Sequence, residues 1–158
     1  MGTSFVTVDG DHGFWMGDGI LDVWLRFLAL HLPEPKRTDD ASSRQVFQKI
    51  RDQFLLASKG WFIGCVPHGL EEAIATPVGE RIIRAGIDSL LSALKKAPPT
   101  LGREVLNLIG ISVTFFRDYE TWRLVEVGNA FLDLLDRKIN SDASSTAFMP
   151  GSGQTEER

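Results

Sequence analysis

Residues 20–32 read Ile20-Leu21-Asp22-Val23-Trp24-Leu25-Arg26-Phe27-Leu28-Ala29-Leu30-His31-Leu32, and this stretch decides the fold. Ten of its thirteen side chains are apolar, which leaves a helix almost no polar face. A helix that is apolar nearly all round belongs in the centre of a protein. Asp22 and Arg26 are four residues apart, on the same side of such a helix, where we expect them to pair. The stretch therefore predicts a central core helix with one narrow polar ridge.

The composition is that of an ordinary globular domain. The chain has 158 residues, of which 43% are hydrophobic and 24% are charged, and its formal net charge is -4. A chain of this length buries a sizeable core without metal or disulfides. Its mild negative charge gives no attraction to phosphate backbones or to anionic membranes, and it would suit a basic protein partner. We therefore expect neither nucleic acid nor a membrane among its partners.

Three features indicate a cytoplasmic protein. Residues 1–9 contain no basic region followed by an apolar stretch, so they do not resemble a secretory signal. The apolar run 20–32 is too short to span a bilayer and contains two charges before His31. Cys65 is the single cysteine and lies in an apolar run, which predicts a buried, unreactive thiol in a reducing compartment.

The pattern as a whole predicts one mainly helical domain over residues 1–139, bundle-like, with minor β content near the N-terminus. Alternating residues over 4–8, turn formers at 9–13 and apolar residues at 14–16 predict two short strands joined by a turn. Asp18 is placed to cap the core helix that follows.

Four further helices follow from the apolar spacing and from capping residues. The clearest start is Thr76-Pro77, because threonine caps a helix and proline suits its first position. Gly128 falls inside the last helix, where a close helix crossing would explain it. The expected helices run from a cap at Thr38, Asp39 or Asp40 to about Ser58, from Pro77 to about Ala97, from Leu101 to Ile109 with Thr100 as cap, and from about Tyr119 to Ile139 with Asp118 as cap and Trp122 on the inner stripe.

Some segments are left open by their pattern, and one is expected to be disordered. The runs 61–66 and 111–116 are short and apolar, and each fits either a strand or a packed loop. Residues 70–75 fit one helical turn or two. From Asn140 to Arg158 small polar residues dominate, so we expect residues 140–158 to form a disordered tail.

No motif in the chain predicts catalysis, a metal or a cofactor. Residues 9–13 begin like a calcium loop, but the third oxygen ligand, the obligatory glycine and the closing glutamate are absent. The apolar neighbours of Cys65 do not favour a thiolate nucleophile with His68 as its base. His68, Glu71 and Glu72 could form an acid–base site, although the dipole at a helix start accounts for the two carboxylates. We expect no catalytic residue and no bound metal or cofactor.

We favour a non-enzymatic protein-binding domain, such as a toxin-neutralising immunity protein or a similar inhibitor that occludes a basic partner. Exposed carboxylates would speed association with a basic surface, and tryptophans in glycine-flanked segments could anchor the contact. The simpler interpretation is that the carboxylates are solvated and that each tryptophan is tucked under its own loop. The candidate partner-binding residues are Trp15, Trp61, Glu71, Glu72, Asp88, Glu120, Asp133 and Asp136.

The alternative hypothesis is a small-ligand-binding protein or an enzyme of uncommon helical type. Its pocket would lie between helices, lined by aromatic side chains and by His68, Glu71 or Glu72. A deep cavity with a strongly perturbed carboxylate pKa would favour this alternative, whereas a solid core would favour the binding domain. An oligomerising module built on Trp15 and Trp61 is a third hypothesis.

Overall fold

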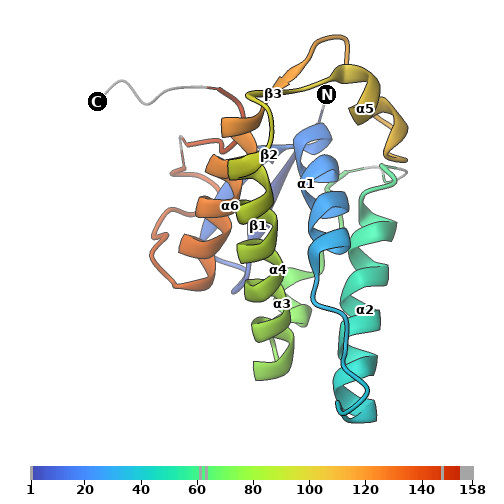
Figure 1. Cartoon of the computed structure of the whole chain (residues 1–158). Coiled ribbons are helices and arrows are strands. Elements are labelled where there is room, and N and C mark those ends of the chain that lie inside the picture. Colours follow the sequence, from blue (N-terminus) through green and yellow to red (C-terminus); the bar gives the residue numbers. More distant parts are fainter. Residues whose placement is uncertain (1, 61, 63, 147, 154–158) are drawn as a thin grey trace.

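The computed structural model describes residues 2–60, 62, 64–146 and 148–153. Within them the fold is mainly α, with a small two-stranded sheet at the N-terminus and a second, shorter strand pair. Every helix in this part of the chain is too short or too polar to cross a membrane. The elements in chain order are β1 (Thr3–Thr7), β2 (Gly13–Gly17), α1 (Asp18–His31), α2 (Ala41–Ala57), α3 (Leu70–Ala73), α4 (Pro77–Lys96), β3 (Thr100–Leu101), α5 (Arg103–Leu108), β4 (Tyr119–Glu120) and α6 (Thr121–Leu135) (Figure 1).

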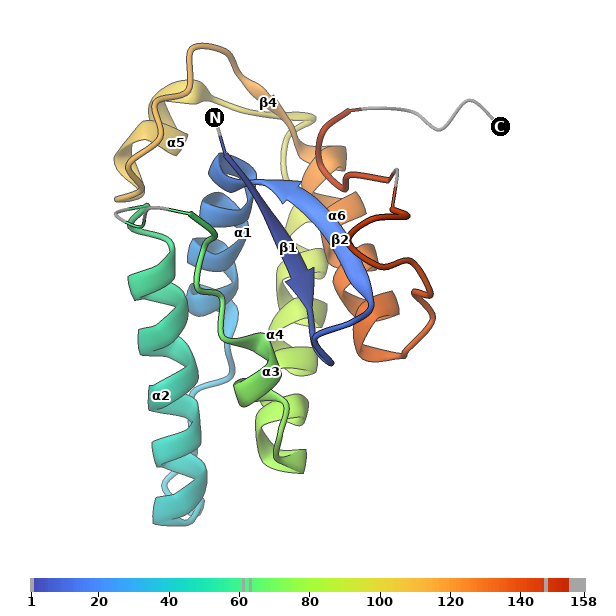
Figure 2. The ribbon, with the colours of Figure 1, turned by 180° about the vertical axis from the view of Figure 1, so that it is seen from behind.

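The N-terminal residues form the hairpin that their alternation predicted. β1 and β2 pair in antiparallel orientation, with Phe5 opposite Trp15. Val6, Phe14 and Met16 are buried. The hairpin covers one face of the helical part, and α4 lies on the other face (Figures 1 and 2). The hairpin therefore closes the core on the side away from α4.

The α1 helix lies in the core, as the apolar stretch predicted. Leu21, Trp24, Leu25 and Leu28 are fully buried. The helix contacts α2, α4 and β2. Elements from both halves of the chain therefore meet on α1, which explains why almost no position in it is polar.

The polar residues of α1 differ from the expectation. Asp18 is the first residue of the helix rather than its cap, and its carboxylate accepts a 2.6 Å hydrogen bond from Ser4 Oγ. Asp22 and Arg26 form no ion pair in the described structure. Arg26 instead donates through Nη2 to the carbonyl oxygen of Gly110, 2.9 Å away. A distant acceptor has replaced the local partner that the four-residue spacing suggested.

The α2 and α4 helices begin at predicted capping residues. The carboxylate of Asp40 accepts a 2.7 Å hydrogen bond from the backbone N–H of Ser43. The hydroxyl of Thr76 accepts one of 3.1 Å from Gly79. These caps satisfy N–H groups that have no partner inside the helix. Residues of the first turn decide such starts, so the local sequence was enough to predict them.

Residues 98–121 differ from the prediction. Thr100 belongs to β3, which pairs with β4, so it does not cap a helix. Asp118 does not cap α6; its carboxylate accepts a 3.0 Å hydrogen bond from the backbone N–H of Arg103 at the start of α5. The run 111–116 forms no strand. Pairing between segments far apart in sequence, which local pattern does not show, organises this region.

The buried face of α6 is rotated from the predicted stripe. Trp122, expected in the core, is 44% exposed, whereas Leu124 is buried. The predicted close crossing at Gly128 is confirmed: a Cβ there would overlap the side chain of Leu91 on α4 and lie 3.0 Å from the ring of Trp24. Because Gly128 must face α4 and α1, Trp122 is carried to the surface.

The described residues 140–146 and 148–153 differ from the disorder expected after Asn140. The N–H of Gly13 donates to the carbonyl oxygen of Ser141 at 2.9 Å, and Ser141 Oγ donates back to the carbonyl of Gly13 at 3.0 Å. Farther along, the hydroxyl of Tyr119 donates to the carbonyl of Gly151. Polar groups fix this segment together with Phe148, which packs partly buried against the core, so its mainly small and polar composition did not indicate order.

Gly128→Ala should lower the free energy of unfolding by about 1–3 kcal/mol, because the added methyl group overlaps Leu91 at a close helix crossing. Urea denaturation followed by circular dichroism measures the change. Gly102→Ala is the matched control, since a Cβ at Gly102 would meet no atom within 4 Å. The control should change stability by less than about 0.5 kcal/mol. Equal stability of the two variants would contradict the close crossing.

Candidate functional site

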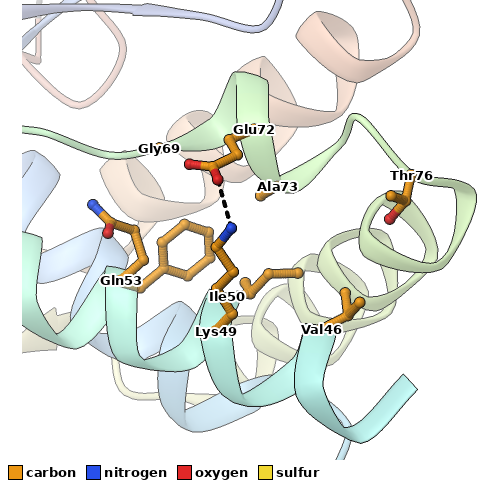
Figure 3. A pocket seen from close by; sticks show the side chains of 9 residues that line it. Val46, Lys49, Ile50, Gln53, Gly69, Glu72, Ala73 and Thr76 are labelled. Atoms are coloured by element: carbon orange, nitrogen blue, oxygen red, sulfur yellow. Dashed lines mark hydrogen bonds and ion pairs between the residues drawn. The ribbon is translucent and has the colours of Figure 1, made fainter. Parts of the chain in front are cut away.

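A small hollow lies between α2 and α3 (Figure 3). Val46, Ile50 and Phe54 follow one another at four-residue intervals and present one apolar face of α2 to it. The cavity volume is about 120 Å³, well below the roughly 300–1,000 Å³ of drug-sized ligand sites. The lining residues are Val46, Lys49, Ile50, Gln53, Phe54, Gly69, Glu72, Ala73 and Thr76.

An ion pair joins the two helices at the rim of this hollow. Lys49 Nζ donates to Glu72 Oε1 at 2.5 Å (Figure 3). This hydrogen bond and the charge of Lys49 lower the pKa of the Glu72 carboxyl. Glu72 therefore stays ionised at neutral pH, which does not suit a general acid.

His68 joins β1 to α3. Its Nε2 lies 3.3 Å from the carbonyl oxygen of Phe5, and its Nδ1 accepts a 3.1 Å hydrogen bond from the N–H of Leu70. A ring nitrogen that accepts from an N–H carries no proton, so we assign the proton to Nε2, which donates to Phe5. Burial lowers the pKa of His68. Both ring nitrogens are used inside the fold, so the acid–base role considered as an alternative for His68 lacks a free nitrogen.

The predicted carboxylates are spread over several elements rather than gathered on one face. Asp133 and Asp136 come together around Lys138, at 3.9 and 3.6 Å, and Asp136 also pairs with Arg84 at 2.8 Å. Their charges are thereby partly neutralised within the chain. Of the others, Glu72 pairs with Lys49, Glu120 pairs with Arg123 at 2.8 Å, and Glu71 and Asp88 are exposed without an ion pair among the described residues.

The structure describes the position of one of the two predicted tryptophans and of the cysteine. The ring of Trp15 contacts Phe5 at a centroid distance of 5.4 Å, and its Nε1 donates to the carbonyl oxygen of Ala143 at 2.8 Å. Trp15 therefore holds the C-terminal segment against the hairpin. Trp61 lies outside the described residues. Cys65 is exposed, so the expectation of a buried thiol was wrong; a bend in the chain interrupts the apolar run just before it.

The α5 helix and the loop after it lie at the end of the molecule where α1 begins (Figures 1 and 2), and they carry exposed apolar side chains. Val105 and Leu108 of α5 are 57% and 84% exposed, and Phe116 is 81% exposed. Val105 and Phe116 line one shallow hollow. Leu108 follows Val105 by three residues and so lies on the same side of α5. We call Val105, Leu108 and Phe116 the end surface.

Hydrogen bonds from α5 hold the loop that presents Phe116. Asn107 donates through Nδ2 to the carbonyl oxygen of Phe115 at 3.0 Å and accepts from its N–H at 2.7 Å. Arg103 donates to the carbonyl oxygen of Phe116 at 3.1 Å. Asp118 accepts from the backbone of Arg103. The loop therefore has a defined conformation although it contains no strand.

A groove adjoins the end surface, between the start of α1 and residues 113–120. Its volume is about 770 Å³, and Ile20, Val113 and Phe115 contribute to its apolar lining. Phe115 packs edge-to-face on Tyr119 at a centroid distance of 6.2 Å. Phe116 borders both this groove and the hollow beside Val105, so the apolar surface is continuous.

The sequence contained one indication of the end surface, in the apolar residues of 105–109, that the predicted binding residues did not include. Val105, Leu106, Leu108 and Ile109 span an arc of about 160° around a helix, because successive residues turn by about 100°. An arc this wide is more than a short surface helix has to bury, and in the structure Leu106 is buried while Val105 and Leu108 are exposed. Phe116 gave no such signal, because a phenylalanine in an apolar run is normally a core residue.

No known protein family, curated protein or solved structure matches this chain. Across the described ranges, no group of three or more His, Cys, Asp or Glu side chains could hold a metal ion. The functional argument therefore depends on the two features of the chain itself, the end surface and the hollow between α2 and α3.

The contribution of His68 to the free energy of unfolding should fall as the pH decreases below 6.5, the ordinary pKa of histidine. Because the pKa of folded His68 is lowered, the unfolded chain binds more protons than the folded one in this range. His68→Gln should remove this part of the pH dependence. Urea denaturation at about pH 7.5 and about pH 5.5 measures it.

His31→Gln is the control for this experiment. His31 is partly exposed on α1, where its Nδ1 lies 3.2 Å from Ser89 Oγ. This variant should retain the pH dependence of the wild type. An unchanged dependence in His68→Gln would contradict the role assigned to the buried ring.

Proposed function

We propose that this chain is a non-enzymatic protein-binding domain and that its partner packs on the end surface. The observation that carries the proposal is that the side chains of Leu108 and Phe116 are 84% and 81% exposed to solvent. Large apolar side chains that project together from a surface are typical of interaction sites. The adjoining groove would receive a side chain of the partner beside Phe116.

The fixed conformation of the loop supports this proposal. Asn107 and Arg103 already hold the backbone of Phe115 and Phe116, so a partner would not have to order it. Binding to a preorganised surface avoids the entropy cost of ordering a loop. In this proposal α1, α2, α4 and α6 act as a bundle-like support for the end surface.

The partner we propose is a basic protein. Next to the end surface, Glu104 and Arg117 are exposed charges of opposite sign, so the contact itself is nearly neutral. Attraction at longer range would come from the net charge of -4, to which the exposed Glu71 and Asp88 contribute. Such charge speeds association, whereas apolar contact supplies affinity. An immunity protein or inhibitor that occludes a basic toxin would combine these properties.

Affinity capture from the host cytosol tests the proposal. We place the protein there because its single exposed thiol would stay reduced. The wild type should retain one basic protein at a one-to-one ratio, and less of it at high salt. Leu108→Glu combined with Phe116→Glu should weaken binding at least about tenfold, because central apolar side chains carry most of the binding energy. Calorimetry with the purified partner measures the affinity.

Leu30→Glu is the matched control for the capture experiment. Leu30 is 62% exposed near the far end of α1 from the end surface. This variant carries a similar change and should bind as the wild type does. The proposal is wrong if the double variant and the control bind equally well, or if the cytosol yields no protein whose capture depends on the end surface.

The hollow between α2 and α3 favours a second candidate function, the binding of a small apolar ligand. Its floor is apolar, and the Lys49–Glu72 pair lies at its rim. A cavity of about 120 Å³ suits a single aromatic ring rather than a larger molecule. The interhelical pocket of the alternative hypothesis would then exist, lined by Phe54 and Glu72 but without His68.

Toluene should bind this hollow and shift the NMR signals of the methyl groups of Val46 and Ile50. Ala73→Leu should abolish the shifts, because the larger side chain fills the hollow that Ala73 lines. Ala75→Leu, at an exposed position just after α3, is the matched control and should leave binding intact. Wild-type signals that do not respond to toluene would exclude this second candidate.

A further inference from the structure

The carboxyl group of Asp22 is buried beneath two loop segments. The residue is 1% exposed. A Cβ at Gly60 would lie 3.0 Å from Asp22 Oδ2 and would overlap Ser112 Oγ, so both residues lie over the carboxyl group. Ser112 Oγ donates to the carbonyl oxygen of Gly60 at 3.4 Å. The two loop segments therefore meet above a side chain that ordinarily carries a charge.

Few charged groups act on Asp22. Asp18 and Arg26, one turn away on either side along α1, act on it with opposite sign. Gly60 and Ser112, which cover the carboxyl group, carry no charge. Lys59 precedes Gly60 in the sequence. The protonation state of Asp22 is therefore set mainly by burial and by its two neighbours on α1.

Two buried polar atoms at this place have no hydrogen-bond partner in the described structure, Asp22 Oδ1 and Arg26 Nε. One atom can accept and the other donates. The two residues are four apart on α1, a spacing at which a carboxylate and a guanidinium group pair. Unsatisfied buried polar atoms cost free energy. Both atoms are without a partner here, while Arg26 donates through Nη2 to Gly110.

The segment that Arg26 holds leads directly into the end surface. Gly110 is bound by Arg26, Ser112 lies over Asp22, and Val113 packs against Gly19, where a Cβ would lie 3.1 Å from Val113 Cγ1. Residues 110–113 therefore run along α1 in the direction opposite to the helix. Phe116 follows only three residues later, so loosening this segment would leave Phe116 held by the hydrogen bonds from α5 and no longer by α1.

We propose that Asp22 and Arg26 form a switch that controls the end surface. While Asp22 keeps its proton, Arg26 donates to Gly110 and residues 110–116 stay on α1. When Asp22 releases its proton to solvent, its carboxylate pairs with Arg26, the hydrogen bond to Gly110 breaks and the segment loosens. This regulation acts on the site of the proposed function and rests on that function for its biological consequence.

The pKa of Asp22 places this switch near neutral pH. Burial and then the negative charge of Asp18 raise the pKa to about 7, against the opposing charge of Arg26. Because the ordinary value is 3.8, the folded chain binds more protons than the unfolded chain between pH 3.8 and about 7. Stability from this group is therefore lost as the pH rises through that range. We expect an ordered end surface below neutral pH and a looser one above it.

Hydrogen exchange of the backbone amides of residues 110–116 tests the switch without any partner. After correction for the intrinsic exchange rate, opening should be about tenfold more frequent near pH 8 than near pH 6. Asp22→Asn keeps the shape of the side chain but cannot ionise, and should keep the segment protected at both pH values. Arg26→Met removes the donor to Gly110 and should give fast exchange at both.

Asp88→Asn is the matched control, since it removes an exposed carboxylate on α4 and should keep the wild-type pH profile. Urea denaturation of each variant identifies any that has lost its global fold. Wild-type exchange that does not change with pH, an unchanged profile in Asp22→Asn, or protection in Arg26→Met would each overturn the switch. Failure of the end surface to capture a protein, with the exchange results as expected, would overturn the proposed function alone.

Discussion

The burial of α1 on nearly all sides is the constraint on which the rest of the structure depends. A helix that is apolar on nearly every side gains stability only if other elements cover most of it. Here α2, α4 and the hairpin contact it, and Gly128 brings α6 close to the ring of Trp24. The same enclosure keeps the side chain of Asp22 away from water. Loop segments at Gly60 and Ser112 complete the cover, so the loops are part of the core packing.

Features that depend on neighbouring residues could be predicted from the sequence. The caps at Asp40 and Thr76, the hairpin and the core position of α1 all follow from local chemistry or spacing. The errors at Asp118 and Trp122 have a different origin. Asp118 found a distant backbone group on α5, and Trp122 was turned outward because Gly128 had to face α4. Tertiary partners decided both positions, and no local pattern contains them.

The candidate site was predictable only in part, for the same reason. The carboxylates could be recognised one by one, but their partners on other elements, such as Arg84 for Asp136, could not. Leu108 and Phe116 have the chemistry of core residues, and only the folded chain shows that they are exposed. A single sequence distinguishes a core side chain from a binding side chain poorly, because both are large and apolar.

The hydrogen bonds between the hairpin and the C-terminal segment have a consequence for biosynthesis. Trp15 and Ala143, like Gly13 and Ser141, are 128 residues apart in the chain. Contacts of such long sequence separation form only after a large loop has closed. During translation the backbone of Gly13 and the indole N–H of Trp15 therefore lack these partners until residues 141–143 have been synthesised. For that time the outer edge of β2 stays uncovered at Gly13, and uncovered sheet edges are sites at which chains associate.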